Sequence, residues 1–78
     1  MRNVKVLGTG CSNCKATQRL IEETAHALGV VVTVEKVEDL QRIMAFNVMS
    51  TPGVVVDGKV VHAGGVPSRE AVASWLTA

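Results

Sequence analysis

The chain has 78 residues, of which 47% are hydrophobic, 3% aromatic and 19% charged, and its formal net charge is +1. A chain of this length and apolar content folds as one domain, so we predict a single domain over residues 1–78. Balanced charge and only two aromatic side chains argue against nucleic-acid binding. No apolar run approaches the about 20 residues that cross a bilayer, so we expect no membrane association.

The N-terminal half predicts a strand, a helix and a second strand. The first strand covers residues 4–7, and glycines follow it. Residues 12–28 predict an amphipathic helix, because their apolar positions recur at spacings of three and four while charged residues take the other face. Gly29 is typical of a helix end. The β-branched run at residues 30–37 predicts the second strand.

A short helix is expected next, over residues 38–46, with acidic residues in its first turn. The side chains expected to point inward from it are Leu40, Ile43 and Met44. Val48 and Met49, which follow, are also core candidates. If they are exposed, they would instead form an apolar rim that accepts a partner protein.

The C-terminal third predicts a β-hairpin and a final helix. Asp57-Gly58 separates strands at residues 54–56 and 59–63, and this dipeptide is a strong hairpin signal. Pro67-Ser68 then opens a helix that extends to residue 76. Its apolar stripe consists of Val72, Trp75 and Leu76.

These elements define an α/β fold in the order βαβαββα. The first two strands pair in parallel around a right-handed crossover, and the hairpin adds two more strands. The prediction is a four-stranded mixed sheet flanked by three helices that cover both of its faces.

The two cysteines, Cys11 and Cys14, lie where the first strand passes into the first helix. Cys11 is expected beside the unpaired N–H groups of the first helical turn, which favour a reactive thiolate. Cys14 is one turn later on the apolar stripe and should be more buried. We therefore predict that Cys11 is the attacking nucleophile and that Cys14 resolves the mixed disulfide.

The residues around the pair suit a helix-starting turn. Ser12 and Asn13 have side chains that accept hydrogen bonds from backbone N–H groups. Gly8 and Gly10 permit a tight bend and leave Cys11 approachable. Gly10, Ser12 and Asn13 are therefore predicted to support the site.

A zinc site is the main structural alternative for the cysteine pair, but it needs two further ligands. The sequence offers His26, His62 and carboxylates, and neither histidine shows metal-ligand spacing to the cysteines. We expect both histidines to be solvated surface residues, and no metal ligands are predicted.

Thr51-Pro52 precedes the hairpin. Taken alone, it suits a trans proline that begins a strand, since only about 5–6% of such bonds are cis in folded proteins. A loop that enters the third strand, however, lies at the same sheet end as the exit of the first strand.

Together, these residues resemble the thioredoxin superfamily, and in particular the very small proteins called redox-active disulfide protein 2. The resemblance rests on Gly-Thr-Gly-Cys-x-x-Cys at residues 8–14, Ser-Thr-Pro at 50–52, Asp-Gly-Lys at 57–59 and the glycine break before the last helix. It covers essentially the whole chain. It implies a minimal thioredoxin fold.

The resemblance also implies roles for the Thr-Pro pair. The Thr51–Pro52 bond would be cis, and Pro52 would pack against Cys11 and Cys14. The backbone of Thr51 would pair with an extended substrate segment, so both residues are candidates for substrate binding.

The chain departs from larger thioredoxins at three places. Thr9-Gly10 precedes Cys11 with no tryptophan, and the dipeptide between the cysteines is Ser-Asn. The first strand carries Lys5 and no acid, so the buried carboxylate that assists proton transfer in the larger enzymes has no visible counterpart. We expect the stem of Lys5 to cover an apolar surface while its ammonium reaches water.

The predicted function is thiol–disulfide oxidoreductase, an enzyme that reduces or exchanges protein disulfides with its own dithiol and no bound cofactor. The expected partners are a protein disulfide and an unidentified reductase, and we expect a monomer. The paired cysteines and the absence of a signal peptide predict a cytoplasmic location. The alternatives are a soft-metal module or metallochaperone for Cu(I) or Zn(II), and a redox-regulated interaction module.

Overall fold

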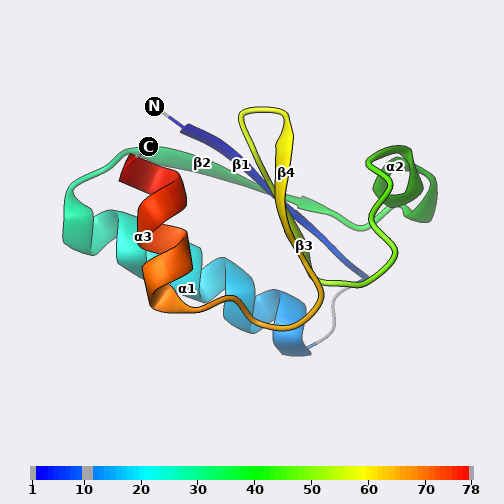
Figure 1. Cartoon of the computed structure of the whole chain (residues 1–78), viewed down its shortest axis with the longest axis horizontal. Coiled ribbons are helices and arrows are strands. Elements are labelled where there is room, and N and C mark those ends of the chain that lie inside the picture. The colour runs from blue at the N-terminus through cyan, green and yellow to red at the C-terminus, as the bar shows by residue number, and fades with distance from the viewer. Residues whose placement is uncertain (1, 10–11, 78) are drawn as a thin grey trace.

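The computed structural model describes residues 2–9 and 12–77. It contains the seven elements in the predicted βαβαββα order, arranged as shown in Figure 1. They are β1 (Arg2–Leu7), α1 (Ser12–Leu28), β2 (Val32–Val37), α2 (Leu40–Ala45), β3 (Gly53–Val56), β4 (Lys59–Ala63) and α3 (Arg69–Thr77). The α/β fold class is therefore confirmed.

The four strands form one mixed sheet in the order β2-β1-β3-β4. β1 runs parallel to β2 and antiparallel to β3, and β4 completes the hairpin with β3. β1 is therefore internal, so its backbone is paired on both sides. The carboxyl end of this internal strand leads into the segment that carries the two cysteines.

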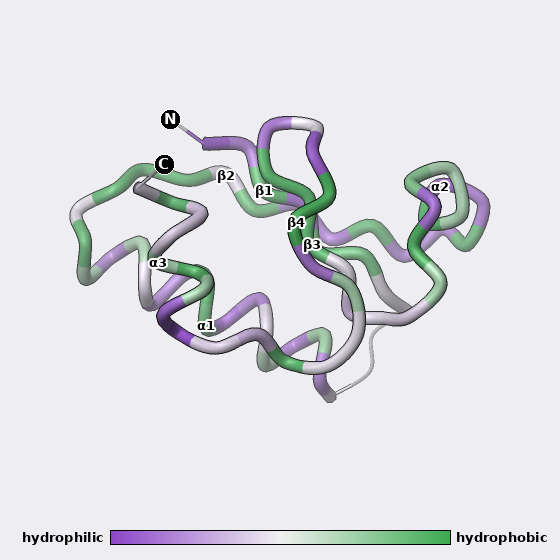
Figure 2. Tube along the Cα trace, viewed as in Figure 1, coloured by the Kyte–Doolittle hydropathy of each residue, from purple (hydrophilic) through white to green (hydrophobic). Residues whose placement is uncertain are grey.

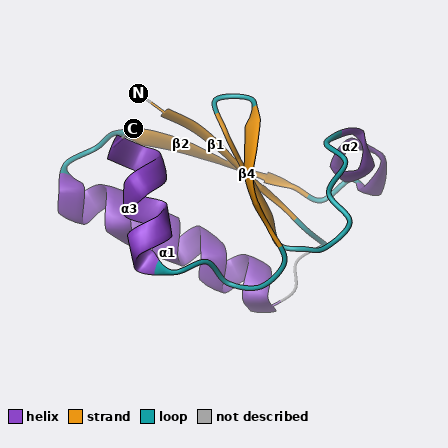
Figure 3. Ribbon diagram, viewed as in Figure 1, coloured by secondary structure: helices purple, strands orange, loops and turns teal. Residues whose placement is uncertain are grey.

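One face of the sheet packs against α1 and α3 (Figure 3). We call this cluster the first core. It consists of Val4, Val6, Val54 and Val56 from the strands with Ile21, Ala25, Val72 and Leu76 from the helices. Val4 and Val6 alternate with Lys5 along β1, whereas all four residues of β3 are buried because both faces of this strand are covered. In α1 the buried residues recur at spacings of three and four, and Figure 2 shows hydrophobic and hydrophilic segments following one another along this helix.

The opposite face carries a smaller second core, formed by Leu7, Val37, Ile43, Val48 and Val55, with Phe46 packed against it. The short helix α2 covers only this end of the face. Asp39 caps it by accepting a hydrogen bond from the N–H of Gln41 at 2.9 Å. Helices thus lie on both faces, as predicted.

The prediction for α2 is wrong in two respects. Leu40 and Met44 are exposed by 62% and 64%, and only Ile43 is buried. A helix of six residues turns a single side chain fully toward the sheet, and Phe46 and Val48 after it supply the remaining contacts. Glu38, expected in its first turn, precedes the capping residue Asp39.

The far end of the sheet from the cysteine segment is closed by the hairpin between β3 and β4. Asp57 and Gly58 have φ of 50° and 84°, the left-handed conformations that a two-residue hairpin turn requires. The Asp57 carboxylate accepts a hydrogen bond from the N–H of Asn3 at 3.0 Å and forms an ion pair with Arg2 at 3.1 Å. These two contacts hold the turn to the start of β1. They hold the pKa of Asp57 below its ordinary value, the Asn3 hydrogen bond contributing most.

Both long helices have identifiable ends. Gly29 follows α1 with φ of 68°, and Ser68 caps α3 by accepting a hydrogen bond from the N–H of Ala71 at 3.1 Å. β2 begins at Val32, two residues later than predicted. None of the described helices combines the length and the apolar character that a membrane crossing needs.

Candidate active site

Cys14 lies in the first turn of α1 and is buried, with 6% of its surface exposed. This agrees with its predicted place on the inner face of the helix. Ser12 begins the helix, and both Ser12 and Asn13 are exposed. The Asn13 carbonyl accepts a hydrogen bond from the buried hydroxyl of Thr17 at 2.8 Å, which ties the first turn to the next. Cys11 and Gly10 lie outside the described residues, so their predicted roles remain predictions.

Gly8 directly follows β1 and lies close to both Cys14 and the loop before β3. A Cβ atom added at Gly8 would collide with the Cys14 sulfur and would lie 3.6 Å from the Cβ of Thr51. Cys14 and Thr51, 37 positions apart in the sequence, are therefore both adjacent to the same backbone position. Only glycine leaves room for the sulfur there.

The Thr51–Pro52 peptide bond is cis, in agreement with the expectation from the resemblance. Thr51 is exposed, whereas Pro52 is buried. The Pro52 carbonyl accepts a hydrogen bond from the N–H of Gly64 at 2.9 Å. Gly64 has φ of 83°, and a Cβ there would lie only 3.2 Å from the Cβ of Ser50. The loop after β4 thus packs closely on the Thr-Pro segment and fixes its position.

A small cavity of about 70 Å³ opens beside Cys14. Val6, Gly8 and Cys14 line its inner part, and its polar lining comes from Lys15, Gln18, Lys36 and Glu38. Lys36 and Glu38 were not predicted to lie at the site. The β1–β2 register pairs Lys36 with Val6, which places Lys36 on the face covered by α1. This pairing between strands cannot be read from the sequence, so the position of Lys36 beside Cys14 was not predicted.

Lys5 belongs to the opposite face of the sheet, the face that carries Leu7 and the second core. Its ammonium donates to the Asn3 side-chain oxygen at 3.0 Å and lies 4.0 Å from a Glu35 carboxylate oxygen. The prediction that the stem of Lys5 covers an apolar surface agrees with this placement.

The two histidines differ from each other. His26 is exposed, as predicted, but His62 is half-buried, so the prediction of a solvated side chain is wrong for it. The His62 ring packs against Trp75 with ring centroids 5.8 Å apart, and its Nε2 is 2.9 Å from the Gly65 carbonyl oxygen. Trp75 is itself half-buried against the first core. Among the described residues, the side chains of His, Cys, Asp and Glu form no group of three that could hold a metal ion.

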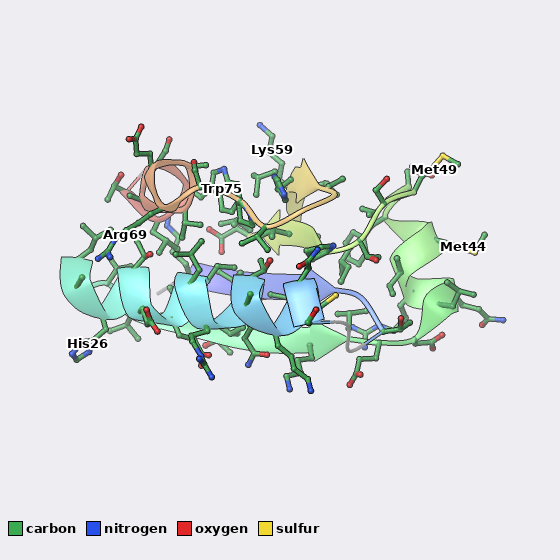
Figure 4. The ribbon with its side chains drawn as sticks, turned by 90° about the horizontal axis from the view of Figure 1, so that it is seen from below. His26, Met44, Met49, Lys59, Arg69 and Trp75 are labelled. Carbon is green, nitrogen blue, oxygen red and sulfur yellow. The ribbon has the colours of Figure 1, made fainter. Side chains whose placement is uncertain are left out.

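Val48 and Met49 precede the Thr-Pro loop and have opposite environments. Val48 is buried in the second core, whereas Met49 is 97% exposed. Figure 4 shows the side chains of Met44 and Met49 projecting outward at the α2 end of the molecule. The prediction of a core position therefore holds for Val48 and is wrong for Met49.

A family model and relatives similar in sequence match most of the chain. A family model described as a thioredoxin domain matches residues 2–77. A thioredoxin of Methanothermobacter thermautotrophicus is 30% identical over 77 residues, which cover 99% of this chain and 100% of the relative. A thioredoxin of Methanocaldococcus jannaschii is 33% identical over 73 residues, which cover 94% of this chain and 84% of the relative.

Two solved structures share the fold. The solution structure of reduced MJ0307 has a TM-score of 0.62 at 25% identity and matches 97% of this chain and 94% of its own. The crystal structure of oxidized mitochondrial thioredoxin 3 from Saccharomyces cerevisiae has a TM-score of 0.68 at 20% identity, with 97% and 76% covered. The resemblance to the thioredoxin superfamily is thus confirmed. The chain belongs to the thioredoxin-domain family and is a thioredoxin-like disulfide oxidoreductase.

Proposed function

We propose that the chain reduces or exchanges disulfides of other proteins through Cys11 and Cys14. The observation that carries the proposal is the convergence of the Cys14 sulfur and Thr51 on Gly8. This arrangement puts a buried sulfur next to an exposed backbone segment on which a partner can lie.

The two cysteines have different roles in the proposed reaction. The Cys11 thiolate attacks a substrate disulfide, forms a mixed disulfide and releases one substrate thiol. Cys14 then loses its proton and attacks the Cys11 sulfur, which releases the second substrate thiol and forms the Cys11–Cys14 disulfide. The substrate gains two electrons and two protons. A reductase then supplies two electrons and two protons to the Cys11–Cys14 disulfide and regenerates the dithiol. The burial of Cys14 supports this assignment, because a shielded thiol is poorly placed for the first attack.

The substrate segment is proposed to lie along Thr51 in an extended conformation. Thr51 is exposed, and the buried Pro52 and the Gly64 hydrogen bond hold the loop in place. Backbone hydrogen bonds to such a segment provide affinity that depends little on the partner's sequence. Gly10, Ser12 and Asn13 border Cys11 in the chain. Gly10 is proposed to leave Cys11 approachable, and Ser12 and Asn13 are proposed to support the turn that begins α1.

Trapping in a cell lysate tests the proposal. A Cys14→Ser variant stops the reaction at the mixed disulfide, so it should retain partner proteins that dithiothreitol releases. The matched Cys11→Ser variant keeps the buried thiol and should retain none. Mass spectrometry of the adducts should place the intermolecular disulfide at Cys11.

Equal retention by the two variants, or adducts at Cys14 alone, would contradict the assigned roles. The absence of dithiothreitol-sensitive adducts from both variants, together with tight Cu(I) or Zn(II) binding by the wild type, would favour the metal-binding alternative.

A further inference from the structure

The loop between β4 and α3 packs on the segment where the substrate is proposed to bind. The N–H of Gly64 donates to the Pro52 carbonyl at 2.9 Å, and Gly64 lies against Ser50. The next residue is Gly65, and the two glycines have φ of 83° and 70°. Glycine loses more conformational freedom on folding than any other residue. Contacts from outside this pair are therefore needed to hold the loop in one position.

His62, near the end of β4, supplies such a contact. Its Nε2 lies 2.9 Å from the Gly65 carbonyl oxygen. Because a carbonyl oxygen only accepts, Nε2 carries the hydrogen of this contact and donates it. The β3–β4 register pairs His62 with the buried Val54, so the ring lies on the face of the sheet that α1 and α3 cover.

Trp75 on α3 holds the imidazole from its other side. The two rings are tilted by 46° with centroids 5.8 Å apart, and Trp75 itself packs against the first core. A chain of contacts thus runs from Trp75 through His62 to the Gly65 carbonyl, and from Gly64 to the Pro52 carbonyl. It connects the C-terminal helix to the Thr-Pro segment without contacting Cys14 among the described residues.

We propose that His62 is a positioning residue, which holds the segment of Thr51 and Pro52 ready for substrate through the Gly64-Gly65 loop. This inference rests on the proposed binding of substrate along Thr51. Without the imidazole donor, the loop would occupy several positions, and the fraction of molecules able to bind would fall. The apparent affinity for substrate falls by the same fraction. The thiols are untouched, so KM should rise while kcat stays the same.

Steady-state kinetics of insulin reduction, with dithiothreitol as electron donor, tests this role. His62→Leu removes the donor, and its KM for insulin should rise about fivefold with kcat within about twofold of wild type. His62→Gln is the conservative variant, because its side-chain amide can donate from a position close to that of Nε2. It should restore most of the wild-type KM.

Amide hydrogen exchange tests the position of the loop without reference to activity. In the reduced protein, His62→Leu should speed the exchange of the Gly64 N–H about tenfold, because local opening of the loop exposes this group. The Ile21 amide in the middle of α1 should exchange as in wild type. His62→Gln should leave the exchange of Gly64 close to the wild-type rate.

A core variant separates positioning from a general loss of stability. Val72 is fully buried in the first core, so Val72→Ala should lower Tm but leave the KM for insulin unchanged. An equal rise of KM in Val72→Ala and His62→Leu would overturn the role of His62. So would unaltered Gly64 exchange in His62→Leu, or a KM in His62→Gln as high as in His62→Leu.

The two proposals fail in different ways. Normal reduction of insulin by wild type, with unchanged KM in His62→Leu, would overturn the positioning role and leave disulfide exchange intact. If wild type did not accelerate insulin reduction over dithiothreitol alone, the proposed exchange itself would be overturned, whatever the exchange rate of the Gly64 amide.

Discussion

The two ends of the sheet are held together in different ways. At one end, Gly8 lies against the Cys14 sulfur and close to Thr51, and Gly64 packs on Ser50 in the Thr-Pro loop. At the other end, the Asp57 turn between β3 and β4 is held to the start of β1 by a hydrogen bond and an ion pair. The first end depends on close backbone approach and the second on electrostatics. Substitutions at the two ends should therefore affect different properties of the protein.

The largest effect is expected for Gly8→Ala. The new methyl group would collide with the Cys14 sulfur, so we expect a loss of about 2 kcal/mol in the free energy of unfolding, as for other overpacked sites. The displaced sulfur should also reduce the rate of disulfide reduction more than tenfold. Denaturant unfolding and a turnover assay measure the two effects. Thr9→Ala, at the exposed neighbouring position, is the control and should change neither.

The next largest effect is a gain in stability, and it is expected in α1, between the two ends of the sheet. The hydroxyl of Thr24 is buried and has no hydrogen-bond partner among the described residues. Thr24→Val replaces it with a methyl group of similar size and should raise the free energy of unfolding by about 1 kcal/mol, or Tm by about 4–8 °C. Thr17→Val is the matched control, because the Thr17 hydroxyl donates to Asn13. It should not stabilise, and equal gains in both variants would contradict this explanation.

The contribution of the hairpin end to the stability of the fold should depend on pH. The Asn3 hydrogen bond, and then Arg2, lower the pKa of Asp57 in the folded protein. The ionised carboxylate therefore stabilises the fold fully at pH values above about 3.9, the pKa of an aspartate in the unfolded chain. This stabilisation is lost as the pH falls through the folded pKa. The Tm difference between wild type and Asp57→Asn should therefore be largest near neutral pH and should shrink below about pH 4.

Asn tolerates the left-handed turn, so Asp57→Asn changes charge more than conformation. Arg2→Met should keep part of the acid dependence, because the Asn3 contact remains. A difference in Tm that does not vary with pH would show that the carboxylate charge is unimportant. Disulfide reduction at pH 7 should be unaffected in both variants.

The smallest effect is expected for Met49→Gln. This side chain is 97% exposed, so its replacement should change the free energy of unfolding by less than about 0.5 kcal/mol. Its neighbour Val48 is 6% exposed, and Val48→Ala should cost about 2 kcal/mol. Equal destabilisation in urea unfolding would contradict the opposite environments of these adjacent residues.

The order of the elements could be predicted because each has a local signal, such as the Asp57-Gly58 turn, the Gly29 helix end and the alternating valines of β1. The exposure of Leu40 and Met44 could not, because helical spacing does not show how much of a short helix the sheet can cover. The approach of Lys36 and Glu38 to Cys14 depends on strand register, which is non-local. The packing of His62 on Trp75 likewise joins two distant segments.

The cis bond at Thr51–Pro52 was expected from the family resemblance and not from local pattern, because most such bonds are trans. The position of Gly8 was correctly linked to a tight bend. Its closeness to both Cys14 and Thr51, however, is visible only once the sheet is assembled.

The central claim is that Cys11 and Cys14 exchange disulfides as an unequal pair. The most direct measurement is the reduction of insulin disulfides with dithiothreitol as electron donor, compared for wild type, Cys11→Ser and Cys14→Ser. Wild type should exceed the rate of dithiothreitol alone, and Cys11→Ser should fall to that background. Cys14→Ser should accumulate a mixed disulfide through Cys11. Activity of Cys11→Ser equal to that of wild type would contradict the account.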